Sequence, residues 1–291
     1  MSYKAEPGQN IVTYGVSTCH GCGIENAFRT VIRALGPRTI IVIPPGCSAM
    51  FSGVGGETSV RIPGYQANLE NTAATAAGIR AGLDVQGKKD INVLGWAGDG
   101  GTIDIGLQAL SGAMERGDHI IYCCVDNEAY MNTGIQASGS TPLGASTTTT
   151  PGGKPTFRKN MMEIVAAHRI PYAATCSIAH LEDLVKKVEK AKNCGGTAYL
   201  HILTPCPTGW GYEPDQTVNV CRLAVQTNAW PLFEVIKGTE YHLTQKVAKP
   251  VPVVDYLKAQ HRFAKITPEQ MTEFQATVDK EYALLVKRAQ A

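Results

Sequence analysis

Five short apolar runs rich in Val and Ile constrain what this chain can fold into. Each run has the length of a β-strand and is continuous rather than alternating, which is typical of parallel strands buried on both faces. The predicted strands span residues 39–43, 91–95, 119–125, 172–176 and 198–203, and the helices predicted between them span 23–35, 68–83, 104–115 and 181–192. This alternation predicts an α/β fold with a doubly wound, mostly parallel sheet, whose ligands bind at the carboxyl ends of the strands.

The charge balance and the hydropathy pattern exclude several classes of protein. The 291 residues include 27 Lys and Arg against 25 Asp and Glu, which gives a formal net charge of +2. No basic excess is present to neutralise phosphates, so we expect no nucleic-acid partner. No apolar run approaches the roughly 18 residues of a membrane helix, and the polar N-terminus lacks the apolar core of a signal peptide. We therefore expect a cytoplasmic protein without a membrane partner.

The sequence predicts one large domain followed by a tail. Residues 1–236 contain all the predicted strands, together with two Gly- and Pro-rich loops over 138–155 and 204–214. A long loop inside a compact domain is usually functional or disordered. Residues 237–291 end in a predicted helix over 268–288. We expect this tail to contact a partner subunit, with a peripheral helix as the alternative.

A Gly-Asp-Gly turn followed by a distant Asn predicts a diphosphate and Mg²⁺ site. Gly98-Asp99-Gly100-Gly101 links a predicted strand to a helix, and the N–H groups of such a helix start suit a diphosphate. Asn127 follows the next predicted strand, so Asp99, Asn127 and the backbone carbonyl of Ala129 would bring three hard oxygen ligands together. A purely structural turn, or a site for another phosphate ligand, would satisfy the same pattern.

Four of the nine cysteines lie beside Gly and Pro rather than inside periodic apolar segments. Cys19 and Cys22 form a Cys-x-x-Cys pair before a predicted helix, and Cys47 and Cys206 each follow a predicted strand. Four thiolates can hold a [4Fe–4S] cluster or a tetrahedral zinc. One pair plus two dispersed cysteines favours the cluster, whereas unliganded or redox-active thiols are the remaining alternative. Cys221 is the main rival for the fourth position.

As a set, four segments resemble those of one protein family. They are CHGCG from Cys19, GDGGTIDIGLQALSGAMERG from Gly98, DNEAYMNTGIQASGSTP from Asp126 and PCPTGW from Pro205. From about Cys19 to residue 234, the chain resembles the thiamine-diphosphate-binding β subunit of the 2-oxoacid:ferredoxin oxidoreductases, of which the pyruvate enzyme is the commonest member. The resemblance implies the diphosphate-type thiamine-diphosphate-binding fold.

The resemblance also implies a role for particular residues. It assigns Mg²⁺ to Asp99, Asn127 and the carbonyl of Ala129, and it implies a catalytic role for Asn132 near the aminopyrimidine and the thiazolium. It prefers Cys206 over Cys221 as the fourth ligand, and iron over zinc. The implied [4Fe–4S] ligands are Cys19, Cys22, Cys47 and Cys206, and the implied cofactor-binding residues are Gly46, Gly98, Asp99, Gly100, Gly101, Thr102, Asn127, Asn132 and Thr133.

The activity implied by the resemblance is the oxidative decarboxylation of a 2-oxoacid on thiamine diphosphate. Electrons pass one at a time to the [4Fe–4S] cluster and on to ferredoxin, and coenzyme A accepts the acyl group. The Glu that activates the aminopyrimidine comes from an α subunit with the pyrimidine-type domain, so no acid or base is assigned to Glu128 here. Ferredoxin-like γ and δ subunits, or fusions of them, complete the implied complex.

The substrate is the part of this interpretation that stays open. Where related pyruvate enzymes carry bulky aromatics, this chain reads SVRIPGYQANLEN over 59–71 and LGASTTTT over 143–150. Pyruvate is the default, and oxalate, phenylglyoxylate and branched 2-oxoacids are alternatives. A non-redox thiamine-dependent decarboxylase or synthase with structural zinc, and a non-catalytic electron-transfer subunit, are the competing functions.

Overall fold

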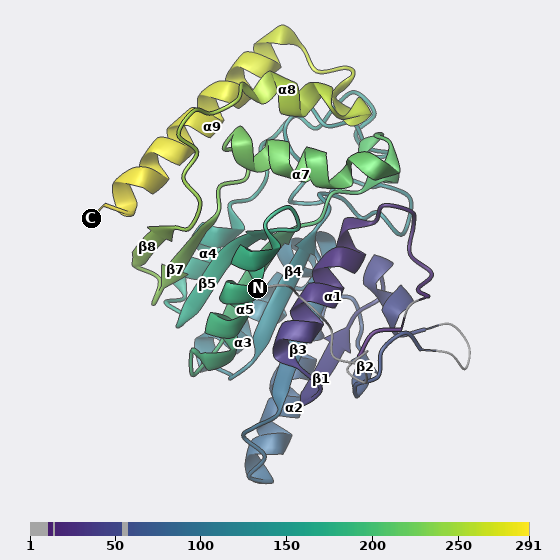
Figure 1. Cartoon of the computed structure of the whole chain (residues 1–291), viewed down its shortest axis with the longest axis vertical. Coiled ribbons are helices and arrows are strands. Elements are labelled where there is room, and N and C mark those ends of the chain that lie inside the picture. Colours follow the sequence, from purple (N-terminus) through teal and green to yellow (C-terminus); the bar gives the residue numbers. More distant parts are fainter. Residues whose placement is uncertain (1–10, 14, 54–57, 291) are drawn as a thin grey trace.

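The computed structural model of the chain describes residues 11–13, 15–53 and 58–290. Within these ranges the strands form one eight-stranded sheet in the order β2-β1-β3-β4-β6-β5-β7-β8 (Figure 1). The first six strands are parallel, β7 pairs antiparallel with β5, and β8 pairs antiparallel with β7. The strands are β1 (Thr39–Ile43), β2 (Gly64–Gln66), β3 (Asn92–Gly98), β4 (Ile121–Asp126), β5 (Tyr172–Ser177), β6 (Ala198–Leu203), β7 (Phe233–Ile236) and β8 (Glu240–Leu243).

Helices cover both faces of the sheet, as a doubly wound fold requires. The helices are α1 (Gly23–Leu35), α2 (Thr72–Val85), α3 (Leu107–Arg116), α4 (Met161–Ala167), α5 (Leu181–Asn193), α6 (Pro207–Trp210), α7 (Thr217–Gln226), α8 (Val253–Lys258) and α9 (Pro268–Arg288). Shorter turns of helix span Cys47–Phe51, Gly100–Asp104, Pro214–Gln216 and His261–Phe263.

Side chains of β4 alternate between two hydrophobic cores, one on each face of the sheet. Ile121, Cys123 and Val125 pack into a core that includes residues of α1, α5 and α7. Tyr122 and Cys124 pack into a second core with residues of α2, α3 and α4. Every residue of β4 is buried, which explains why its sequence is continuously apolar up to Asp126 at its carboxyl end. The predicted α/β fold with a mostly parallel sheet is confirmed.

Several predicted elements coincide with the observed ones, and others differ at their ends. The predictions over 39–43, 198–203, 23–35 and 268–288 match β1, β6, α1 and α9. The helix predicted over 104–115 begins later, at Leu107, because Gly100–Asp104 forms a wider π-type turn first. The short strands β2, β7 and β8 were not predicted, since three or four residues carry too little periodicity.

The tail after residue 236 joins the sheet and then covers one end of the molecule. Its first element, β8, pairs antiparallel with β7 at the sheet edge. Figure 1 shows α8 and α9 beyond the sheet near α7, with α9 (yellow) running down toward β8. A capping box between Thr267 and Gln270 starts α9. Along the described ranges, no helix combines the length and the apolar character needed to cross a bilayer.

Candidate cofactor and cysteine site

Three oxygen atoms converge where β3 and β4 end. These strands are parallel neighbours, with Gly98 opposite Val125, so Asp99 and Asn127 leave the same edge of the sheet. The side-chain oxygen of Asn127 lies 3.1 Å from Oδ1 of Asp99 and 2.8 Å from the carbonyl oxygen of Ala129. Rotating the Asn127 amide by 180° would instead let its NH₂ group donate to both of those oxygens.

The spacing of these oxygens suits an octahedral Mg²⁺. With Mg–O bonds of about 2.0–2.1 Å, neighbouring ligands of an octahedron lie about 2.9 Å apart. The two separations in the structure, 2.8 and 3.1 Å, bracket that value. A carboxylate, an amide oxygen and a backbone carbonyl are also the hard ligands that Mg²⁺ prefers. The residues at this edge therefore fit the cation, and we call the three oxygens the cation cage.

The charge of Asp99 gives a second reason to expect a cation here. Asp99 is buried, and its Oδ2 accepts a hydrogen bond of 2.5 Å from the Ser138 hydroxyl. Burial, followed by the negative charge of Asp126, raises the pKa of Asp99 well above its usual range. Burying a carboxylate without a compensating charge is unfavourable. A bound cation would remove this cost.

The glycine turn after β3 is closely packed. A Cβ added to Gly100 would lie 2.2 Å from Cε1 of Tyr130, whose hydroxyl donates to the Gly100 carbonyl at 3.2 Å. The buried Thr102 hydroxyl donates to the Gly98 carbonyl at 2.7 Å, which closes the turn on itself. A Cβ on Gly101 would lie 3.3 Å from Leu69. Glycine at position 100 therefore lets an aromatic ring cover the turn.

The remaining predicted cofactor residues lie on more open loops. Asn132 and Thr133 are exposed in a turn closed by the Tyr130 N–H, which donates to the Gln136 carbonyl at 2.8 Å. The Thr133 hydroxyl donates to Gln136 Oε1 at 2.6 Å. Gly46 follows β1 and precedes Cys47, with φ at 144° and nothing within 4 Å of an added Cβ. Asn132 thus projects from an exposed turn near the cage rather than from a buried wall.

The four predicted cluster cysteines lie within electrostatic range of one another. Cys22 immediately precedes α1, Cys47 begins a helical turn after β1, and Cys206 immediately precedes α6. Burial, then the neighbouring thiols of Cys206 and Cys19, raise the pKa of Cys22 to about 11. Burial, then Cys22, Cys206 and Cys19, raise the pKa of Cys47 to about 12. The negative charge of Asp99 makes a further, smaller contribution to the raised pKa of Cys47.

The two candidates for the fourth cysteine differ in their surroundings. Cys206 is half-buried, and its sulfur accepts a hydrogen bond from the Gly209 N–H at 3.3 Å. Cys221 is fully buried in α7, where its sulfur lies 3.2 Å from the Ser177 hydroxyl. Among the residues that the structure describes, no three His, Cys, Asp or Glu side chains converge as the ligands of a single metal ion.

Several charged and aromatic residues around the cage were not predicted from the sequence. Glu128 accepts hydrogen bonds from Arg158 and Arg262, and Oδ2 of Asp126 accepts one from Nε2 of His201 at 2.8 Å. Trp210 donates from Nε1 to the carbonyl of Asn127 at 2.8 Å. Trp210 lies in the PCPTGW segment, and Asp126 and Glu128 lie in the DNEAYMNTGIQASGSTP segment, whereas the sequence carried no signal for the two arginines or the histidine.

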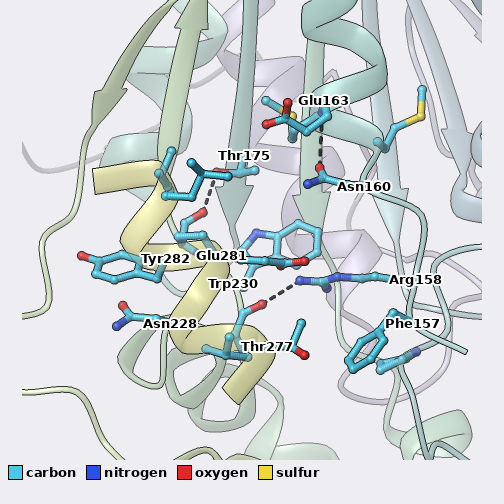
Figure 2. A pocket seen from close by; sticks show the side chains of 18 of the residues that line it. Phe157, Arg158, Asn160, Glu163, Thr175, Asn228, Trp230, Thr277, Glu281 and Tyr282 are labelled. Atoms are coloured by element: carbon cyan, nitrogen blue, oxygen red, sulfur yellow. Dashed lines mark hydrogen bonds between the residues drawn. The ribbon is translucent and has the colours of Figure 1, made fainter. Parts of the chain in front are cut away.

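A separate cavity of about 350 Å³ lies beside α9. Figure 2 shows Arg158 beside Trp230 there, while Glu281 and Tyr282 project from α9. The Arg158 guanidinium lies 5.0 Å from the centre of the Trp230 ring and donates to the Ala229 carbonyl at 2.7 Å. Arg158 therefore joins the wall of this cavity to Glu128 beside the cage.

Comparison with known proteins places the fold in one class. The family model described as thiamine pyrophosphate enzyme, C-terminal TPP binding domain, matches residues 45–202. These residues include the glycine turn and all three oxygens of the cation cage. In a 2-oxoglutarate:ferredoxin oxidoreductase from Magnetococcus marinus, one chain shares the fold, with a TM-score of 0.60 and 23% identity over 68% of this chain and 67% of that one. The chain is thus a thiamine-diphosphate-binding α/β protein.

Curated relatives narrow this class further. The pyruvate synthase subunit PorB of Methanothermobacter thermautotrophicus is 49% identical over 278 residues, covering 94% of this chain and 96% of the relative. The ketoisovalerate oxidoreductase subunit VorB of Pyrococcus furiosus is 44% identical over 287 residues, covering 95% and 92%. The chain belongs to the family of thiamine-diphosphate-binding β subunits of 2-oxoacid:ferredoxin oxidoreductases.

Proposed function

We propose that this chain works within a multisubunit enzyme that oxidatively decarboxylates a 2-oxoacid, with pyruvate as the default substrate. The observation that carries the proposal is the cation cage of Asp99, Asn127 and Ala129, whose oxygen spacing suits Mg²⁺. Relatives named for pyruvate and for ketoisovalerate support a 2-oxoacid as the substrate class. Coenzyme A as the acyl acceptor, and ferredoxin as the final electron acceptor, belong to the same proposal.

The residues of this chain would bind and orient the cofactor. The cation cage would hold Mg²⁺ against the diphosphate, and the backbone N–H groups after Gly98 would face the diphosphate oxygens. When bound, thiamine diphosphate supplies the electron sink that decarboxylation of a 2-oxoacid requires. Asn132 would approach the reactive end of the cofactor from its exposed turn. Because this turn is open, a partner subunit with the pyrimidine-type domain would close the site over it.

The four cysteines would hold a [4Fe–4S] cluster next to the cofactor. Their mutual electrostatic influence, and that of Asp99 on Cys47, support a common site at one edge of the sheet. Each thiol must lose its proton to become a ligand. Bound iron would offset the cost of forming thiolates at these buried positions, where the pKa of the thiol is raised. Such a cluster accepts electrons singly, and ferredoxin-like γ and δ subunits would carry the electrons onward.

The first test is a visible spectrum of the complex purified without oxygen. Absorbance at about 400 nm reports a [4Fe–4S] cluster, and we expect it to fall when the correct 2-oxoacid is added. Pyruvate, oxalate, phenylglyoxylate and a branched 2-oxoacid are added in turn, so the spectrum also names the substrate. A colourless complex that contains zinc would refute the redox function and favour a non-redox thiamine-dependent enzyme.

A pair of serine substitutions tests the fourth cluster ligand. We expect Cys206→Ser to lose iron and absorbance, because Cys206 interacts electrostatically with Cys19, Cys22 and Cys47. Cys221→Ser is the matched control, since Cys221 lies in the core against Ser177, and we expect it to keep its iron. Loss of iron in the Cys221 variant alone would contradict the assignment.

A further inference from the structure

Glu128 lies between two residues of the cation cage, and its backbone is held in an unfavourable conformation. Its φ of 63° lies in the left-handed region, which residues with a side chain rarely adopt. The Glu128 N–H donates to Oδ1 of Asp126 at 2.8 Å, and the Glu128 carbonyl accepts from the Thr141 hydroxyl at 2.6 Å. This sharp turn allows the Asn127 side chain and the Ala129 carbonyl to face the same point.

The side chain of Glu128 is held by two arginines, of which Arg262 is the more deeply buried. The Glu128 side chain is 1% exposed, and its Oε2 accepts from Nη2 of Arg262 at 2.5 Å. Its Oε1 accepts from Nη1 of Arg158 at 3.3 Å. The Arg262 side chain is 4% exposed, against 30% for Arg158. Within an ion pair this buried, loss of one partner leaves an uncompensated charge.

Arg262 also stacks on a second residue that contacts the cage. Its guanidinium carbon lies 3.7 Å from the centre of the Trp210 ring, and Trp210 donates to the Asn127 carbonyl at 2.8 Å. The guanidinium is fixed in turn, because its Nε donates to Oε1 of Gln260 at 2.9 Å. Arg262 therefore holds the segment from Asn127 to Ala129 through Glu128 and through Trp210.

Trp210 connects this arrangement to the loop over residues 204–214, which carries Cys206 and which we call the cysteine loop. Trp210 is the last residue of α6, which begins directly after Cys206, and its N–H donates to the Cys206 carbonyl at 2.9 Å. Next to it, a Cβ added to Gly209 would lie 2.2 Å from the sulfur of Met131. The cysteine loop and the loop of the cation cage are thus in direct contact, and Arg262 comes from the tail, where it packs over both.

We propose that Arg262 is a positioning residue for the cation cage. It holds Glu128 in the left-handed conformation and orients Trp210 against the Asn127 carbonyl, so that the three cage oxygens keep the spacing of an octahedral cation. The inference rests on the proposed function of the cage. A purely structural ion pair would stabilise the fold without any effect on cation affinity, and this difference makes the proposal testable.

The test measures the Mg²⁺ concentration that gives half-maximal binding of thiamine diphosphate to the intact complex, by equilibrium dialysis. We expect Arg262→Met to raise this concentration by about 10- to 100-fold, the usual effect of removing a residue that orients metal ligands. Arg288→Met is the matched control. Arg288 also pairs with a glutamate, Glu163, and lies 5.1 Å from an aromatic ring, that of Tyr241, but none of these residues contacts the cage.

A second variant guards against loss of folding. Arg262→Lys keeps the positive charge but loses the planar guanidinium, which stacks on Trp210 and donates to both Glu128 and Gln260. We therefore expect a smaller rise in the Mg²⁺ concentration for half-maximal binding than in Arg262→Met. Mg²⁺ half-saturation within twofold of wild type in both Arg262 variants would overturn the proposal, even if their unfolding temperatures fall. If the wild-type complex instead binds thiamine diphosphate without any dependence on Mg²⁺, the assignment of the cation cage as a Mg²⁺ site is refuted, and the proposed function with it.

Discussion

Replacing Asp99 with Asn should have opposite effects on stability and on cofactor binding. Asp99 is 1% exposed, and the negative charge of Asp126 lies close enough to raise its pKa further. Without a cation, the buried carboxylate opposes folding, whereas with Mg²⁺ it is the charged ligand of the cage. Asp99→Asn keeps the shape of the side chain and removes only the charge.

The structure sets the size of both effects. Replacing a buried ionic group with a neutral one is often stabilising by about 1–4 kcal/mol. The charge-assisted hydrogen bond from Ser138, 2.5 Å long, becomes an ordinary one, at a cost of about 1 kcal/mol. The net gain without cation is then about 0–3 kcal/mol. With an unfolding entropy of about 2.1 cal/mol/K per residue over 291 residues, this gain raises the unfolding temperature by up to about 5 °C.

The same substitution should weaken Mg²⁺-dependent binding of thiamine diphosphate at least about 100-fold, or about 2.7 kcal/mol. The assay compares wild-type and variant complexes at one scan rate, after chelation of divalent cations and again with saturating Mg²⁺ and thiamine diphosphate. Iron content is measured in parallel, and we expect it to stay unchanged. An Asn variant that unfolds at a lower temperature without cation, or that keeps wild-type Mg²⁺ affinity, would refute this reasoning.

Two further predictions concern packing and charge. Gly100→Ala should weaken thiamine diphosphate binding, because the added Cβ would lie 2.2 Å from Cε1 of Tyr130 and would displace that ring. Gly78→Ala in α2 is the control: nothing lies within 4 Å of its Cβ, so it should raise the stability of the fold by about 0.5–1 kcal/mol. Equal behaviour of the two variants in cofactor titration and thermal unfolding would contradict this prediction. Burial alone would raise the pKa of Glu234, but hydrogen bonds from a lysine and a tyrosine lower it. A lowered pKa stabilises the fold above the unfolded value of about 4.3, so Glu234→Gln should cost about 1–2 kcal/mol at pH 7, and the difference should vanish as the pH falls through the folded pKa. Thermal unfolding across pH 3–7 tests this, and a difference independent of pH would contradict it.

Local patterns allowed much of the fold to be predicted. The strands over 39–43 and 198–203 and the helix over 23–35 were predicted with their observed bounds, because strands buried on both faces are continuously apolar and helix starts carry their own turn residues. The proximity of Asp99 and Asn127 was predicted by the same reasoning, because they directly follow the ends of two neighbouring parallel strands, β3 and β4. The structure brings oxygens of these two side chains to 3.1 Å.

The surroundings of the cage could not be predicted in this way. Arg262 is separated from Glu128 by 134 positions, and their pairing depends on the path of the tail over α6. No local pattern distinguishes an arginine that will be buried against a glutamate from one on the surface. The antiparallel pairing of β7 with β8 is another such feature, because strands of four residues are too short for periodicity to identify.

By itself, the sequence determined the class of fold and the chemistry offered at the sheet edge. Apolar periodicity, the glycine turn and the cysteine spacing are local properties, and each depends on a few neighbouring residues. Only the tertiary structure decided the order of the strands, the contact between the cysteine loop and the cation cage, and the burial of Glu128 between two arginines. These depend on which distant segments pack together, because burial and ion pairing are set by the whole core and not by the residues that flank them along the chain.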